Sequence, residues 1–227
     1  MSITRVLALW TASIVISATS LSAGAELSTY RGFQFGMSVA AVARHGGISP
    51  EPRIVDQRPE LIQELMWLPT RAGAMADEGD SAQKILFTFY NDQLSRVVVS
   101  YDRSRTEGLT AEDLIEAIST TYGVAPIPSV GTAPLIPGRN ADDKILARWE
   151  DPQYSITLFR SKYLSTFGLV LLSKRLDGLS MVAHAEAMLL DEREAPARES
   201  ARRQGRTDDD RLREETVRRA NKAAFKP

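Results

Sequence analysis

The 227-residue sequence contains no cysteine, which excludes disulfide bonds, zinc–thiolate sites, iron–sulfur clusters and a cysteine nucleophile. Histidine is almost as scarce, with only His45 and His184. The chain also lacks an excess of either charge, because 28 Lys and Arg residues stand against 29 Asp and Glu residues. Nucleic-acid-binding proteins normally carry a basic excess, so we expect no nucleic-acid partner.

The sequence also lacks the short motifs that mark common catalytic and nucleotide sites. It has no G-x-S-x-G nucleophile elbow, no P-loop and no G-x-G-x-x-G segment. Ser81-x-x-Lys84 matches one motif of penicillin-recognising enzymes, but the companion K-T-G is missing. We therefore predict no catalytic residue and no cofactor.

Candidate oxygen ligands, from side chains or the backbone, follow an order similar to that of calcium-binding loops at Asp102, Ser104, Thr106, Gly108, Thr110 and Asp113. Glu107 occupies the position where the sharp turn of such a loop requires glycine, and Arg103 and Arg105 place positive charge beside the ligands. The same residues fit a connection between a strand and a capped helix. The sequence thus predicts no metal site.

The first 25 residues have the pattern of a secretory signal peptide. Arg5 is followed by an apolar stretch at residues 6–16 and by small residues that end at Ala25. This order predicts export to the periplasm with cleavage after Ala25. The alternative is a retained anchor, because the uncharged run of residues 6–25 is just long enough to span a bilayer. Contact with the membrane is expected only in that case.

Three segments share a pattern typical of a helix start: Gly36-Met37-Ser38, Gly108-Leu109-Thr110 and Gly178-Leu179-Ser180. In each, a Ser or Thr follows an apolar residue and stands at the N-cap position. The pattern is clearest at Thr110, where Asp113 three residues later completes a capping box. The predicted helices cover residues 39–45, 111–122 and 181–194, and the last ends near Pro196.

Runs with strand character fill the two intervals between these helices. They lie at residues 62–68, 85–90 and 94–101, and then at 145–150, 154–160 and 167–174. The order α-βββ-α-βββ-α predicts an α+β fold of two tandem α-βββ repeats, 26–107 and 108–177. These repeats would form an antiparallel sheet with the helices packed on one face, and the third helix would complete a domain at residues 26–190.

Residues 191–227 form a charged tail with 11 basic and 9 acidic side chains. Glu and Arg at i, i+4 spacing favour a helix, but no continuous apolar stripe supports a coiled coil. The sequence therefore leaves this tail either helical or disordered. A second irregular segment, residues 124–143, contains four prolines and is predicted to be an extended surface loop. Such a loop is either functional or a tolerated insertion.

Strand alternation separates the two faces of the predicted sheet. Nine apolar residues fall on one face, which we predict to be the core: Ile85, Phe87, Phe89, Val97, Val99, Ile156, Leu158, Leu169 and Leu171. The other face mixes apolar residues with five side chains that we predict to form a binding surface: Tyr90, Arg96, Arg148, Thr157 and Lys174. Aromatic and cationic side chains on an apolar surface are suited to binding a protein or an anionic ligand. The alternative is that the third helix or the tail covers this face.

Two families share features with this sequence. Gly36-Met37-Ser38 followed by Val42, with the aromatic-rich residues 30–35 before it, resembles the small outer-membrane assembly lipoproteins (the SmpA/OmlA, or BamE-like, family). The doubled pattern of a helix and strands is similar to the tandem-repeat fold of β-lactamase inhibitor proteins. Both resemblances imply non-catalytic periplasmic proteins that act by protein contact. This chain departs from them because it has neither a lipid-accepting cysteine nor disulfides.

These observations favour a non-catalytic periplasmic protein that binds a cell-envelope protein through the open sheet face or the proline-rich loop. The alternative is a periplasmic module that binds a small anionic ligand or peptide through Arg96, Arg148 and Lys174. A hydrolase with an unrecognised site is a third hypothesis, which the lack of catalytic motifs disfavours.

Overall fold

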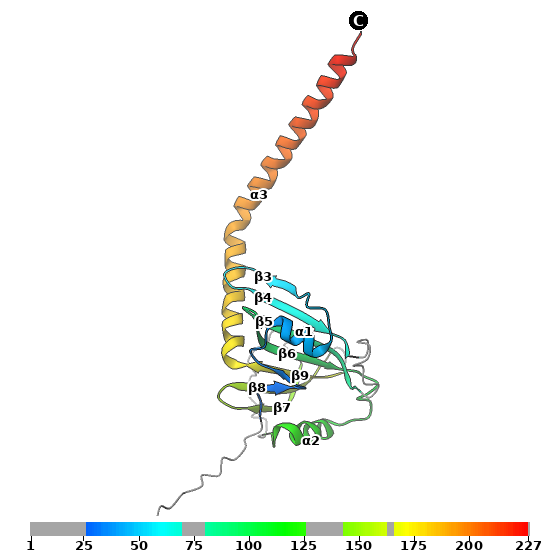
Figure 1. Ribbon diagram of the computed structural model, residues 1–227, viewed down its shortest axis with the longest axis vertical. Helices are drawn as coiled ribbons and strands as arrows, with labels where there is room; N and C mark the ends of the chain where they lie inside the picture. The colour runs from blue at the N-terminus through cyan, green and yellow to red at the C-terminus, as the bar shows by residue number, and fades with distance from the viewer. Residues whose placement is uncertain (1–25, 70–79, 126–142, 163–165, 227) are drawn as a thin grey trace, which may run out of the picture.

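The computed structural model describes residues 26–69, 80–125, 143–162 and 166–226. These residues form an α+β fold in which a seven-stranded antiparallel sheet packs against three helices (Figure 1). The α+β class predicted from the sequence is therefore confirmed. The predicted signal peptide and most of the predicted proline-rich loop lie outside the described residues.

The strands of the large sheet are β3 (Arg53–Asp56), β4 (Ile62–Trp67), β5 (Ala82–Tyr90), β6 (Gln93–Tyr101), β7 (Lys144–Glu150), β8 (Tyr154–Arg160) and β9 (Phe167–Ser173). Their order in space is β3-β4-β5-β6-β9-β8-β7, and every neighbouring pair is antiparallel. β6 and β9 end the two predicted groups of three strands, and they pair with each other at the centre. The two groups therefore form one continuous sheet.

Side-chain caps mark the starts of α1 (Val39–Gly46) and α2 (Ala111–Tyr122), as the sequence predicted. The Ser38 hydroxyl accepts a hydrogen bond from the backbone of the first turn at 3.2 Å. At α2 the Thr110 hydroxyl accepts from the Asp113 N–H at 3.2 Å, and the Asp113 carboxylate accepts from the Thr110 N–H at 2.8 Å. The hydrogen bonds from Thr110 lower the pKa of Asp113, because they favour its charged form.

The predicted core face is buried, since each of its nine apolar residues is at most 1% exposed. α1 covers one part of this face through Val42, together with a short hairpin of β1 (Thr29–Tyr30) and β2 (Phe33–Gln34) that contributes Phe33. Partly buried residues of α2 pack against the same cluster. One hydrophobic core thus joins the large sheet, the hairpin and two helices.

Three short strands were not predicted. β1 and β2 have two residues each, too few for a period-two pattern to stand out in the sequence. β3 has four residues and follows Pro50 and Pro52, which are typical of a loop. Its pairing with β4 rather than its own sequence makes it a strand.

The third helix begins earlier than predicted. α3 (Lys174–Ala224) has 51 residues, so Ser180, predicted as its N-cap, lies inside it. The helix starts directly after β9, and its true N-cap, Ser173, makes no side-chain cap hydrogen bond. No capping signal therefore marks the start. Gly178 resembles a helix boundary in the sequence but is tolerated within the helix, at a cost of about 1 kcal/mol.

α3 also continues through Pro196, where the sequence predicted its end. A proline inside a helix removes one backbone hydrogen bond and bends the helix. Figure 1 shows α3 changing direction where it leaves the rest of the molecule. Pro196 is exposed, so water can satisfy the carbonyl that loses its partner. The sequence left the tail either helical or disordered, and in the structure residues 191–224 are helical.

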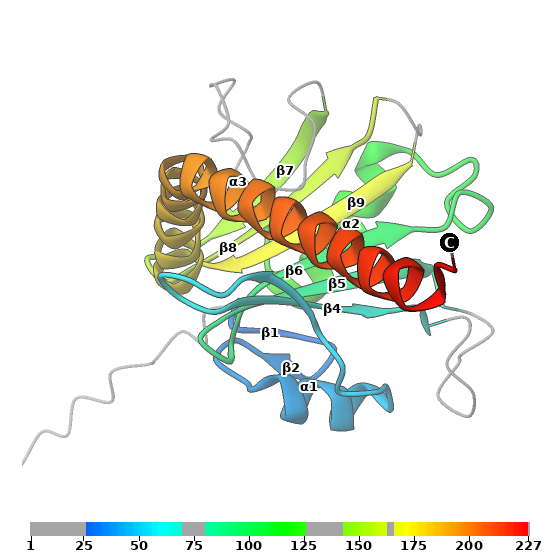
Figure 2. The same ribbon diagram turned by 90° about the horizontal axis from the view of Figure 1, so that it is seen from above.

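Two helices pack on one face of the sheet, as the sequence predicted, and the third helix covers part of the other face, which is the alternative that the sequence left open. α1 and α2 cover the core face, whereas α3 packs against β5, β6 and β9 on the opposite face, here called the second face (Figures 1 and 2). The second face carries its own apolar cluster, formed by Val98, Phe159, Val170 and Leu172. These side chains need a cover, and α3 supplies part of it.

Gly168 on β9 lies under the ring of Phe159, and a Cβ at this position would overlap that ring. Gly168→Ala is therefore expected to lower the free energy of unfolding by about 1–3 kcal/mol, measured by urea denaturation. Gly178→Ala is the matched control, because nothing lies within 4 Å of its added Cβ. Alanine favours helix, so this variant should be at least as stable as the parent. Equal effects of the two substitutions would contradict the packing of Phe159 on Gly168.

Candidate functional site

The first part of α3, residues 174–194, is fixed to the sheet by polar contacts along its length. They join Lys174 to Asp151, Asp177 to Arg96, His184 to Asp56 and Glu194 to Arg58. Twenty residues of helix measure about 30 Å. The contacts therefore hold this part of α3, here called the docked part, at both ends and in between.

The contact between Arg96 and Asp177 is the buried one. Arg96 Nε donates to Asp177 Oδ1 at 2.7 Å, and a second guanidinium nitrogen contacts the same oxygen. The two residues are 7% and 6% exposed. Burial raises the pKa of Asp177, and the Arg96 guanidinium acts in the opposite direction. A buried charge without its partner is costly, so this pair opposes any placement of α3 that separates the two groups.

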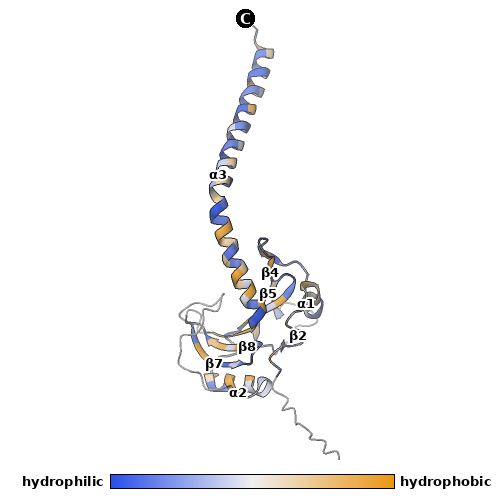
Figure 3. Ribbon diagram, turned by 90° about the vertical axis from the view of Figure 1, so that its left-hand side faces the viewer, coloured by the Kyte–Doolittle hydropathy of each residue, from blue (hydrophilic) through white to orange (hydrophobic). Residues whose placement is uncertain are grey.

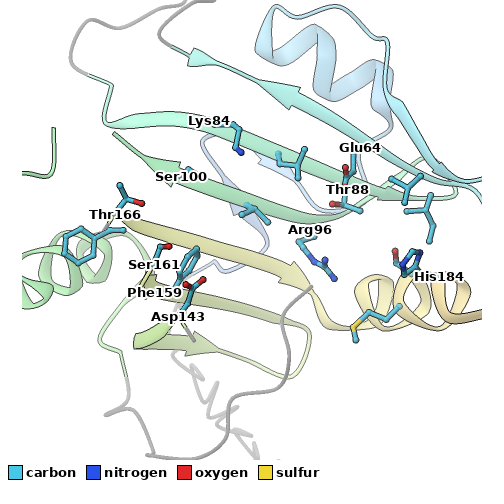
Figure 4. Close-up of a pocket in the computed structure, with 17 residues that line it drawn as sticks. Glu64, Lys84, Thr88, Arg96, Ser100, Asp143, Phe159, Ser161, Thr166 and His184 are labelled. Atoms are coloured by element: carbon cyan, nitrogen blue, oxygen red, sulfur yellow. The ribbon is translucent and has the colours of Figure 1, made fainter. Parts of the chain in front are cut away.

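Beside the docked part of α3, the second face carries a groove with a cavity volume of about 360 Å³ (Figure 4). Its apolar lining includes Ile62, Leu86, Val98, Phe159, Phe167 and Met181. Met181 comes from α3, and the others come from five strands of the sheet. The volume falls within the range of ligand-binding pockets, about 300–1,000 Å³.

The floor of the groove crosses the strands. It extends from Ile62 on β4, through Leu86 on β5 and Val98 on β6, to Phe159 on β8. Leu86 and Val98 are direct cross-strand neighbours. Adjacent strands lie about 4.8 Å apart, so four steps from β4 to β8 span about 19 Å. The groove is therefore elongated.

Lys84 is the exposed cation of the groove (Figure 4). Its cross-strand neighbour is Ser100, and within the described residues its ammonium makes no ion pair or hydrogen bond. Other charged groups of the lining are engaged: Glu64 pairs with Arg53, and the Asp143 carboxylate accepts a backbone hydrogen bond at 3.2 Å. The groove thus offers one cation to a bound molecule.

The five residues predicted as a binding surface do not form one site. Arg96 lines the groove, but its guanidinium is paired with Asp177. Arg148 and Thr157 are cross-strand neighbours on β7 and β8. Thr157 is only 1% exposed, and neither residue lines the groove.

The remaining two predicted residues lie at the ends of elements. Tyr90 is the last residue of β5 and is not part of the groove lining. Lys174 begins α3, where its ammonium donates to Asp151 O at 2.6 Å and lies 3.2 Å from Glu150. The hypothesis of an anion site on Arg96, Arg148 and Lys174 therefore places two of its three cations in internal contacts.

Four residues that line the groove were not predicted from the sequence: Lys84, Ser100, Met181 and His184. Strand alternation does place Lys84 on the same face as Leu86, so this residue could have been found from its strand. Met181 and His184 could not, because their place depends on where α3 docks. Nothing in the sequence of α3 shows which sheet face it covers.

His184 is held by an acid in a manner that resembles part of a hydrolytic triad. Its Nδ1 lies 2.6 Å from Asp56 Oδ2, and Ser180, one helical turn earlier, also lines the groove. A triad needs the nucleophile hydrogen-bonded to the base, and within the described residues the Ser180 hydroxyl makes no such bond. The contact of His184 with Asp56 is explained by the attachment of α3 to β3.

In the described part of the chain, no three His, Asp or Glu side chains are grouped as metal ligands. None of the helices there combines the length and the apolar character needed to cross a bilayer. Comparison of the chain with protein-family models, with curated proteins and with solved structures finds no match. The two family resemblances stay predictions from residues and element order.

The buried pair can be tested by comparing a broken pair with a replaced one. Asp177→Ala leaves Arg96 buried without its partner and should lower the free energy of unfolding by about 3–5 kcal/mol. The double variant R96M/D177L removes both charges and keeps an apolar contact, so it should recover most of that loss. Urea denaturation measures both values. A double variant no more stable than Asp177→Ala would contradict this account.

Proposed function

We propose that this protein is a non-catalytic binding protein of the periplasm, and that its groove holds an apolar segment of another cell-envelope protein. The groove is the observation that carries the proposal. α3 covers the second face only in part, and the apolar floor beside it stays partly open at Leu86 and Val98.

The dimensions of the groove suit an extended polypeptide. An extended chain rises about 3.3 Å per residue, so a floor of about 19 Å accommodates about six residues. The floor is apolar at Leu86 and Val98, and Met181 forms part of the wall. Methionine is flexible and polarizable, and it adapts to apolar side chains of different shapes. These features favour a segment with several apolar residues.

The charge of the groove adds a second requirement. Lys84 presents a cation beside the apolar floor. An acidic side chain of the partner would find a counter-charge there, and charge complementarity of this kind contributes chiefly to specificity. We therefore propose that the bound segment carries an acidic residue next to its apolar ones.

We also infer that the two α-βββ units, α1 with β4–β6 and α2 with β7–β9, are a tandem repeat. The antiparallel pairing of β6 with β9 supports this inference, because it brings the last strands of both units together at the sheet centre. The resemblance to β-lactamase inhibitor proteins rests on the same order of elements. That resemblance implies a function in protein contact.

A small apolar anion is the second candidate occupant. A cavity of about 360 Å³ with a single exposed cation has the size and charge for such a molecule. It would occupy the same floor and contact the same Lys84. Displacement of a bound anion by peptides separates the two candidates.

Anilinonaphthalene sulfonate is a suitable first probe, because it is apolar, anionic and fluorescent when bound to apolar sites. Val98→Trp fills the floor of the groove and is expected to weaken its binding by about tenfold or more. Lys84→Gln should weaken it by several-fold. Val182→Trp is the matched control, because Val182 lies on α3, is 59% exposed and does not line the groove. This control should bind the probe as the parent does.

Apolar peptides with an acidic residue are then added to the complex. Under the proposed function they displace the probe from the parent protein and fail to bind the Val98→Trp variant. Probe binding that no peptide displaces would favour the small-anion alternative. Probe binding unchanged by Val98→Trp would contradict any function located in the groove.

A further inference from the structure

The distal part of α3, residues 195–224, stands away from the rest of the molecule (Figure 1). No described residue of α3 after Ala187 is buried, and within the described residues its last ion pair with another element is that of Glu194 with Arg58, between β3 and β4. Figure 3 shows this segment as mainly hydrophilic, whereas the docked part includes more apolar residues. Thirty residues of helix extend about 45 Å. We call residues 195–226 the arm.

The charges of the chain are divided between the arm and the remainder. Residues 26–194, here called the body, contain 17 basic and 23 acidic side chains, a net charge of −6. The arm contains 10 basic and 6 acidic side chains, a net charge of +4. The near-zero charge of the whole chain therefore hides an acidic body with a basic projection.

Part of the basic charge forms a row along one side of the arm. Arg198, Arg202 and Arg206 are spaced at i, i+4 and i+8, and Arg213 lies on the same side two turns later, with Asp209 between Arg206 and Arg213. Arg198 pairs with Asp191 at 2.9 Å. Within the described residues, Arg202, Arg206 and Arg213 make no ion pair. Most of this arginine row is thus open to an external anion.

We propose that the arm binds the phosphate groups of an anionic lipid surface through this arginine row. The planar guanidinium of arginine matches the geometry of phosphate oxygens and donates two hydrogen bonds to them. From Arg198 to Arg213 the row measures about 23 Å, so it meets several headgroups rather than a single phosphate. Each contact between an arginine and a phosphate is weak, and the contacts of the whole row together provide the binding free energy.

The body has a negative net charge and the arm a positive one. This difference favours an extended lipid surface over a small anion as the partner of the arm. A negatively charged membrane repels the body and attracts the arm, so the field orients the protein with the arm toward the lipid. This orientation keeps the second face and its groove away from the membrane. Export to the periplasm, predicted from the sequence, would place such a surface within reach. The inference does not depend on what occupies the groove.

Vesicle flotation tests this inference. The chain is used from Glu26, as the predicted cleavage would leave it, so that residues 1–25 do not themselves bind lipid. Phosphatidylcholine vesicles with about one third phosphatidylglycerol should bind the protein, and pure phosphatidylcholine vesicles should not. The binding should disappear in about 1 M salt, where the screening length falls to about 3 Å.

The triple variant R198Q/R202Q/R206Q removes most of the arginine row while keeping good helix formers. Its partition onto anionic vesicles should fall by about tenfold or more. The matched control R44Q/R103Q/K144Q removes the same charge from exposed positions of the body. It should change the partition by less than about twofold. The groove variant Val98→Trp should leave vesicle binding unchanged.

Three results would overturn the inference. The first is equal binding to neutral and anionic vesicles, and the second is an equal loss in the arm variant and the body control. The third is binding to a duplex oligonucleotide at salt concentrations that release the vesicles, which would make nucleic acid the preferred polyanion. Circular dichroism checks that the arm variant retains its helix.

Discussion

The buried contact of Arg96 with Asp177 is the interaction on which the arrangement of the second face depends. It joins the middle of the sheet to the first turn of α3, so the helix can cover the second face only on the line that this pair allows. The groove exists because that line leaves Leu86 and Val98 partly open. An apolar contact in its place would permit α3 to slide over the floor, because apolar packing has little directional preference.

The core half of the fold could be predicted from the sequence, because its signals are local. The capping box at Thr110 and the alternation of Phe87 and Phe89 each depend on residues only a few positions apart. Such patterns mark a helix start or a buried strand face whatever the rest of the chain does. The structure agrees with them almost residue by residue.

The arrangement of the second face could not be predicted, because it depends on contacts between residues that are far apart in the sequence. Arg96 and Asp177 are 81 residues apart, and neither shows in the sequence that it has a partner. Arg96 therefore looked like a free cation on an open sheet face. The length of α3 could not be predicted for a similar reason. Gly178 and Pro196 mark helix boundaries in most contexts, but here tertiary contacts stabilise the helix around Gly178 and solvent exposure allows it to continue through Pro196. The position of Lys84 in the groove, by contrast, could have been predicted, because strand alternation places it on the same face as Leu86.

One helix carries out two different tasks in this molecule. From Lys174 to Glu194, α3 contributes small residues such as Ser180 and Ala183 to a buried contact and forms a wall of the groove. Beyond Pro196 the same helix has no buried residue and carries an excess of arginine. Small residues allow close approach to the sheet, and arginines keep a lone helix in water. The change of composition along α3 therefore follows the change in its surroundings, and Pro196 lies where one environment replaces the other.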